Sequence, residues 1–340
     1  MNKIISFNKK GHDPFIDFIK AYAIICVLIG HTMPVTKLGY GLWAGMQVPL
    51  FVLVQSFHSL KKEKSSLDIK KIVWRIIVPF VFIEILIFLV QYISCMDFTC
   101  REQIIYNFIK DGGAGPGSYF PWVYIQISFL LVLIKKVIAK GSLLWLTLIS
   151  IVICEGFELL SSLIDLPDSL YRLLAIRYFF LIYLGWVYVK KGIVVNGWTF
   201  LLSIISGITI IYFEYYSQND EPLFYNTAWK FHRWPCYFYV ANIGVWLLYF
   251  IYQKCLHYKM IADSANLLAK CSYEIFLIQM AIIAIFPKTH FVTDKYLDLG
   301  LKALIIFLIS IGGGFLFNKF YNRLIAKYKL IKNNGIQKSN

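Results

Sequence analysis

The feature that most constrains this chain is a series of apolar runs, each long enough to cross a lipid bilayer. A transmembrane helix needs about 17–25 residues to cross a hydrocarbon core of about 30 Å. Helices satisfy their own backbone hydrogen bonds, as lipid requires. The sequence therefore predicts an all-α integral membrane protein, a bundle of about ten transmembrane helices. Their approximate limits are 15–34, 41–60, 72–94, 119–138, 143–163, 172–190, 197–216, 234–253, 266–286 and 299–320.

Composition excludes a water-soluble alternative. Of the 340 residues, 59% are hydrophobic and only 16% are charged, which is more apolar surface than a soluble fold of this size can bury. The net charge of +15 lies in short basic clusters between apolar runs. That pattern is typical of membrane topology and not of a nucleic-acid surface, so we expect no nucleic-acid partner.

The distribution of basic residues predicts the orientation. With the N-terminus inside, most of the 34 Lys and Arg residues fall in cytoplasmic segments, as the positive-inside rule requires. Both termini are therefore expected in the cytoplasm. We expect a single membrane domain over 1–340, with 1–13 as a cytoplasmic N-terminal segment and 321–340 as a basic tail. The second run is interrupted by polar residues and proline, which predicts a broken or protein-buried helix.

The seven cysteines show no spacing typical of a metal site, so no metal is expected. Cys95 and Cys100 flank a predicted outer loop. They could form a disulfide if that loop faces an oxidising compartment.

His31 is the principal catalytic candidate. It lies inside the first apolar run, where an ionisable residue is costly to bury and usually serves a function. A neutral imidazole near pH 7 takes a proton from a hydroxyl and returns it to a leaving group. The structural alternative is a histidine whose hydrogen bonds are satisfied by a neighbouring helix.

Three basic residues near the inner ends of two runs form a candidate anion site. Lys20 precedes His31 by about 16 Å of helix. Lys71 and Arg75 are four residues apart, which predicts one shared helix face. Several cations at one depth suit a phosphate-bearing ligand, and Arg75 can make bidentate contacts. Lys20 and Arg75 could instead act as topology anchors at the lipid headgroups.

Weaker candidates lie on other runs. Glu84 and Glu155 are near the predicted depth of His31 and could orient its imidazole, or could pair with Arg177 or a tyrosine. The segment 112–126 is rich in glycine and proline, which predicts a turn-rich outer loop. Tyr119 and Trp122 lie in its second half, either as an interfacial aromatic belt or as a platform that stacks against sugar rings.

Several of these residues resemble motifs of the acyltransferase-3 family of bacterial membrane O-acyltransferases. The opening helix of that family carries an acid, then a cation three residues on, then a histidine eleven beyond; Asp17, Lys20 and His31 hold these positions here. Lysine replaces the family's arginine, which keeps the charge but not the planar guanidinium.

Two later stretches extend the resemblance, which covers residues 13 to about 320. Arg75 and Pro79 match the end of the family's basic motif on the third helix, whose first arginine is absent here. Near the end, Ser272 and Tyr273 match a Ser-Tyr signature, while Gln279 replaces its histidine. Gln279 can form hydrogen bonds but cannot titrate, so it is expected to be structural or substrate-orienting.

The resemblance implies transfer of an acyl group, most often acetyl, from cytoplasmic acetyl-CoA to a hydroxyl of a glycan. Lys20, Lys71 and Arg75 would bind the coenzyme A phosphates, and His31 would act as general base. Acetyl-CoA is then a donor substrate, and no bound cofactor is expected. The implied partners are acyl-CoA, a glycan acceptor and the lipid bilayer of the bacterial inner membrane. Whether the chain forms a homo-oligomer or joins a glycan-assembly machinery stays open.

A different class of protein is the main alternative. In a proton-coupled secondary transporter or flippase of a glycan or lipid-linked sugar, His31 and the buried glutamates would form a proton relay. Such proteins typically carry paired helices broken by glycine or proline in their two halves. The sequence shows no evident internal repeat of that kind.

Overall fold

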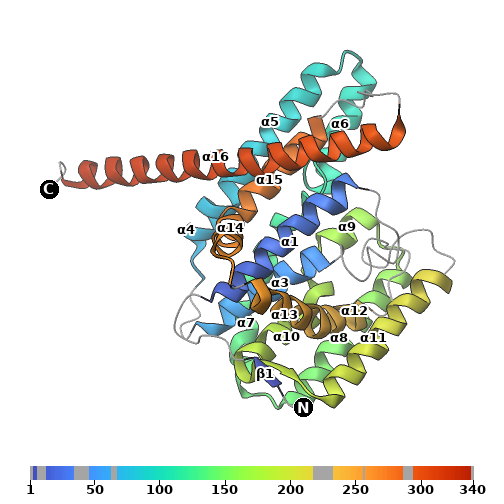
Figure 1. Cartoon of the computed structure of the whole chain (residues 1–340). Helices are drawn as coiled ribbons and strands as arrows, with labels where there is room; N and C mark the ends of the chain where they lie inside the picture. The colour runs from blue at the N-terminus through green and yellow to red at the C-terminus, as the bar shows by residue number, and fades with distance from the viewer. Residues whose placement is uncertain are drawn as a thin grey trace.

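The computed structural model describes residues 3–5, 13–33, 46–62, 67–216, 233–255, 257–285 and 294–337. Nearly all of these residues are helical (Figure 1). The first half contains α1 (Pro14–Thr32), α3 (Gln47–Lys61), α4 (Ile69–Ile72), η2 (Val73–Ile77), α5 (Val78–Ser94), α6 (Phe98–Asp111), α7 (Tyr119–Lys140) and α8 (Leu143–Leu163). The second half contains α9 (Asp168–Leu173), η3 (Ala175–Tyr178), α10 (Phe179–Lys191), α11 (Gly197–Tyr216), α12 (Arg233–Tyr239), η4 (Val240–Gly244), α13 (Val245–Cys255), α14 (Lys259–Lys270), α15 (Ser272–Ile285) and α16 (Lys295–Gln337).

Several helices are long and apolar enough to cross a membrane. Within the described residues there are five, and six if the bent pair α14–α15 counts as one span. The five are Pro14–Thr32, Ile69–Ser94, Tyr119–Ile138, Leu143–Leu163 and Tyr296–Lys327. The other predicted runs correspond to shorter or interrupted helices: α3, η3–α10, α11 and α12–η4–α13. The count of ten spans therefore stays a prediction.

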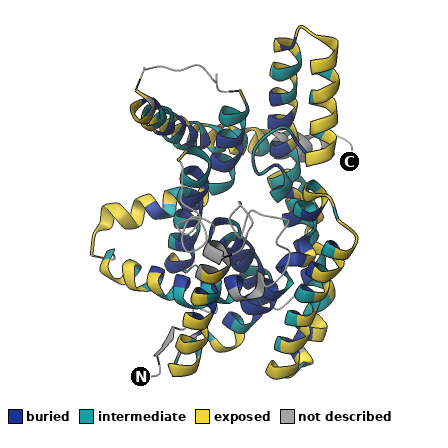
Figure 2. Cartoon of the chain, turned by 90° about the vertical axis from the view of Figure 1, so that its right-hand side faces the viewer, coloured by how far each residue is buried: buried dark blue, intermediate teal, exposed yellow. Residues whose placement is uncertain are grey.

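The buried residues lie toward the centre of the bundle and the exposed residues on its outer faces (Figure 2). Many of the exposed residues are large and hydrophobic. Exposed side chains include Phe82 of α5 at 49%, Val152 of α8 at 67% and Leu316 of α16 at 71%. Such faces would be costly in water, at about 25 cal/mol for each Å² left exposed, whereas lipid tails solvate them. The surface thus supports the membrane-spanning character of the chain.

Helix α1 lies among the other helices and joins the two parts of the core. It begins where Asp13 caps the backbone N–H of Phe15 at 3.0 Å and Pro14 takes the first turn, a common start signal. It packs against α3, α14, α15 and α16. Ile16 and Ile19 belong to a core shared with α3, α7 and α10, while the later residues Ile24 and Leu28 belong to a second core shared with α5 and α15.

The second predicted run is buried inside the protein, as expected. In α3, the polar residues Gln47, Gln55 and Ser56 are all buried. The amide of Gln55 donates to Tyr124 O at 2.9 Å on α7, so a neighbouring helix satisfies it. The absence of a side chain at Gly185 lets α10 approach closely, because a Cβ there would meet Ser56 at 2.6 Å. The residues before Met46 lie outside the described part of the chain.

The third span contains a widened π-turn, η2, directly before Pro79. A proline inside a helix cannot donate its missing N–H and collides with the carbonyl four residues earlier, here that of Arg75. The π-turn relieves this conflict and leaves carbonyls available. Tyr273 donates to Ile76 O at 2.8 Å and Tyr321 donates to Trp74 O. Side chains of α15 and α16 thus stabilise the turn.

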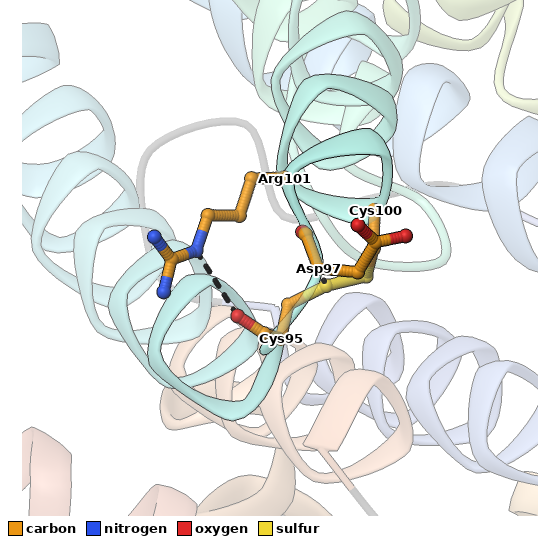
Figure 3. Close-up of a disulfide and its surroundings, with 4 residues drawn as sticks. All are labelled: Cys95, Asp97, Cys100 and Arg101. Carbon is orange, nitrogen blue, oxygen red and sulfur yellow. Dashed lines mark hydrogen bonds between the residues drawn. A yellow bond between two sulfur atoms is a disulfide. The ribbon is translucent and has the colours of Figure 1, made fainter.

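The segment expected as a loop over 95–118 contains a helix. α6 follows α5, and Gly112 ends it in the left-handed conformation with φ 71°, which suits glycine. The Cys95–Cys100 disulfide, which the sequence left open, is present at the α5–α6 corner, and Arg101 Nε donates to Cys95 O at 3.0 Å (Figure 3). The loop signal was correct only for residues 112–118, because α6 is too polar to read as a membrane helix.

Two further predictions need correction. The single helix expected at 172–190 is a short helix, a 3-10 turn and α10, and the run at 266–286 is bent by 68° between α14 and α15. The chain is also not purely helical: β1 (Lys3–Ile5) pairs antiparallel with β2 (Ile193–Val195). β2 follows Gly192, whose φ of 73° ends α10, and its β-branched residues favour a strand.

Candidate functional site

A single large cavity of about 1290 Å³ contains most of the predicted site residues. It is larger than the roughly 300–1,000 Å³ typical of small-ligand pockets. Both Lys20 and His31 line it, so it follows about 16 Å of α1. Tyr119 and Lys135 also line it, at opposite ends of α7 and about 24 Å apart along that helix. The cavity is therefore elongated along the helices.

One end of the cavity, which we call the basic end, gathers cations from four helical segments. Lys71 lies close enough to Lys62 and Arg75 for their charges to repel, and Lys135 Nζ donates to Lys62 O. Among the described residues, no carboxylate lies within ion-pair distance of Lys62, Lys71 or Arg75. The cavity-lining members of the basic end are Lys20, Lys62, Lys71, Arg75 and Lys135.

The structure thus brings together the three predicted anion-binding residues. Lys71 and Arg75 do not share a regular α-helical face, because η2 begins between them, but both line the cavity. Asp17 is buried and pairs with Lys20 at 3.4 Å, so it holds the lysine side chain at the cavity wall and does not itself line the cavity. A concentration of positive charge with few acids is suited to phosphate groups.

His31 occupies the last turn of α1 and lines the cavity. Within the part of the chain that the structure describes, no residue forms a hydrogen bond with its imidazole. The expectation that Glu84 or Glu155 orients it therefore has no support from hydrogen bonding. Glu155 lies on α8, away from the cavity wall.

Glu84 has a different partner. It is 3% exposed, and its Oε2 accepts the backbone N–H of Ala114 at 2.7 Å. This carboxylate therefore ties the glycine-rich loop to α5. Gly113 lies against it with φ 152°, and a Cβ there would meet Glu84 Oε1 at 2.5 Å. The cavity end formed by residues 113–119 with Arg172 and Arg177 is the loop end.

The two aromatic candidates separate. Tyr119 lines the cavity. Trp122 does not; its indole N–H donates to Gly112 O at 2.7 Å and its ring meets Phe80 edge-on. Trp122 thus braces the loop, whereas Tyr119 is available to a ligand. Tyr273 lines the basic end, where its hydroxyl donates to η2. Gln279 is fully buried outside the cavity wall, and its side-chain amide has no hydrogen-bond partner among the described residues.

Besides Lys62 and Lys135 of the basic end, sequence reasoning missed two site residues. His58 lies on α3 and lines the cavity, and its Nε2 is buried without a partner in the described chain. The criterion that selected His31, an ionisable residue in an apolar run, would also have selected His58. Arg177 is 3% exposed and lines the loop end. Its place in the apolar run 172–190 was the available signal.

The described residues contain no group of three or more His, Cys, Asp or Glu side chains arranged to hold a metal ion. The chain matches no protein-family model, and no curated protein matches it.

Proposed function

We propose that this chain is a membrane O-acyltransferase that moves an acyl group, most often acetyl, from cytoplasmic acyl-CoA to a glycan hydroxyl. The observation that carries this proposal is one elongated cavity with a cluster of cations at one end and His31 farther along its wall. The motifs similar to the acyltransferase-3 family fall on the same residues. Five of them, Lys20, His31, Arg75, Ser272 and Tyr273, line this cavity.

In this proposal the basic end binds the phosphates of acyl-CoA. Lys20, Lys71 and Arg75 supply the charge, and the thioester reaches along the cavity toward His31. The separation of about 16 Å between Lys20 and His31 on α1 is of the order of an extended pantetheine arm. Tyr273 acts as a positioning residue, because it fixes the turn that carries Arg75.

The reaction would need one base. His31 Nδ1 or Nε2 takes the proton of the glycan hydroxyl while its oxygen attacks the thioester carbonyl. The C–S bond breaks as the new C–O bond forms, and the imidazolium returns the proton to the coenzyme A thiolate. Removing such a base typically costs 10²–10⁴-fold in rate.

Topology is part of the proposal: about ten spans, with both termini in the cytoplasm of a bacterial inner membrane. The disulfide Cys95–Cys100 supports it, since disulfides persist in oxidising compartments. Both cysteines line the cavity away from the basic end, so the loop end would face outward. Acyl-CoA would then enter from the cytoplasm and the glycan from the outer side.

The test compares His31→Ala with His257→Ala, a histidine that is exposed and outside the cavity wall. We expect His31→Ala to abolish glycan acetylation, read by mass analysis of surface polysaccharide, with an unchanged amount of protein in the membrane. His257→Ala should acetylate normally. Full acetylation by His31→Ala would remove His31 from the mechanism.

One observation favours the transporter alternative. Two helices in different halves of the chain contain π-turns, η2 and η4, and interrupted helices are typical of transporters. The same mass analysis separates the classes. Loss of the acetyl mass from intact polymer supports the acyltransferase, whereas loss of the polymer itself supports a flippase.

A further inference from the structure

A buried guanidinium lies at the loop end of the cavity. Arg177 is 3% exposed and lines the cavity wall. Its guanidinium carbon lies 4.5 Å from the ring centre of Tyr178, 5.2 Å from that of Tyr171 and 5.5 Å from that of Tyr119. The side chain is thus surrounded by aromatic faces from α7, α9 and η3.

Arg177 forms no ion pair with an acidic residue of the described chain. No carboxylate lies within ion-pair distance of it. Glu158 reaches the cluster through Tyr171, whose hydroxyl donates to its two oxygens at 2.6 and 2.8 Å. That carboxylate is therefore engaged by tyrosine. Ring faces attract the cation but accept none of its hydrogen bonds in the plane of the guanidinium.

The donors of Arg177 are only partly used. Nη2 donates to Tyr178 Oη at 2.6 Å, while Nε is buried and has no acceptor within the described chain. A buried charge is strongly disfavoured unless it is paired and hydrogen-bonded. Arginine has five N–H donors in one plane, a geometry that matches a carboxylate or phosphate. Arg172 lines the same cavity.

We propose that Arg177 binds an anionic oxyacid carried by the acceptor, so that the acceptor is an acidic glycan. The oxyacid is a sugar carboxylate or a sugar phosphate, which present the same oxygen pair to the guanidinium. Tyr119 would lie against the sugar ring next to that group. The inference rests on the proposed function in one respect, namely that the bound sugar is the acyl acceptor. The anion site itself can be tested without any reaction.

The experiment measures binding of three probes to the purified full-length chain by calorimetry. The probes are D-glucuronate, glucose 1-phosphate and D-glucose. We expect at least one of the two anionic sugars to bind roughly tenfold or more tightly than glucose, as a charge-assisted hydrogen-bonded pair implies. The anionic probe that binds more tightly identifies the oxyacid. Equal binding of all three probes would overturn the proposal.

Variants then locate the site. Arg177→Gln should reduce binding of the preferred anionic sugar to the level of glucose. Arg101→Gln is the matched control, because Arg101 also lies over a tyrosine ring, that of Tyr92 at 4.9 Å, but outside the cavity wall. An unchanged anion preference in Arg177→Gln would overturn the proposal. Equal binding of the three probes by the wild-type chain would overturn the proposal without any variant, so a poorly folded Arg177→Gln does not remove the test.

Binding of coenzyme A to the same preparation separates this inference from the proposed function. An Arg177-dependent anion preference without coenzyme A binding supports the anion site and counts against the acyltransferase. Coenzyme A binding without an anion preference overturns the acidic acceptor and leaves the acyltransferase intact.

Discussion

Arg75 lies where its helix changes from α to π geometry, and this position gives the residue an unusual surrounding. The carbonyls on either side of it, those of Trp74 and Ile76, accept hydrogen bonds from the hydroxyls of Tyr321 and Tyr273. Its backbone is therefore held by two other helices, while no carboxylate of the described residues lies within ion-pair distance of its guanidinium. A cation held in this way is preorganised for an anionic ligand.

Arg75→Ala should raise the KM for acetyl-CoA by about tenfold or more and change the KM for the glycan much less. The reason is that a hydrogen bond to a charged group contributes about 1.5–3 kcal/mol. Steady-state kinetics in membranes measures both constants. Lys70→Ala is the control, since Lys70 is exposed near the same helix end but does not line the cavity. An equal effect of both substitutions on the donor KM would make Arg75 a topology anchor only.

The residues of the site could be predicted from sequence more readily than their partners. Lys20 and His31 stand out because charges are conspicuous in apolar runs. The partner of Glu84 could not be predicted, because it is the N–H of Ala114, thirty positions away on a loop whose path depends on tertiary packing. Arg177 was weighed only as a possible partner of a glutamate, and its tyrosine surroundings come from three separate segments.

The loop over residues 112–118 shows how one element depends on backbone conformation. Gly112, Gly113 and Gly117 have φ values of 71°, 152° and 89°, which side chains rarely adopt. The Glu84 carboxylate fastens the loop through Ala114. The glycines therefore allow the loop to enter the cavity wall next to Glu84, and the loop end takes its shape from this contact.

Gly113→Ala should destabilise the protein by at least about 1 kcal/mol and weaken binding at the loop end. The added Cβ would meet Glu84 Oε1 at 2.5 Å and Ser118 Cβ at 2.6 Å. Gly156→Ala is the matched control: it lies in α8 with nothing within 4 Å of the new Cβ, so it should be neutral or stabilising. Melting temperatures of the purified variants measure the effect, and equal values would contradict a strained loop.

Apolar length predicted where most helices run, because a bilayer fixes that length physically. The bounds of α7 and α8 agree closely with the expected 119–138 and 143–163. Interruptions were harder to predict. The 68° bend after Lys270 and the π-turn before Pro79 leave the apolar pattern intact, and α6 was missed because its mixed composition resembles a loop.

At the scale of the whole molecule, a cluster of basic residues and a disulfide lie at opposite ends of one cavity. The lysines and Arg75 line the basic end, and the Cys95–Cys100 disulfide lines the cavity at the end of α5. Positive charge favours the cytoplasmic side of a membrane, and a disulfide favours the oxidising side. The two observations are independent, and both support the proposed orientation.

The proposed orientation can be tested by labelling cysteines in intact cells. After treatment with an impermeant reductant, an impermeant maleimide should label the exposed Cys100, and a Cys95→Ser/Cys100→Ser variant should lose that label. Cys255 is a free thiol at the end of α13, on the expected cytoplasmic side. It should react only after permeabilisation. Labelling of Cys255 in intact cells, with Cys95 and Cys100 protected, would invert the topology, and acyl-CoA could then not reach the basic end from the cytoplasm.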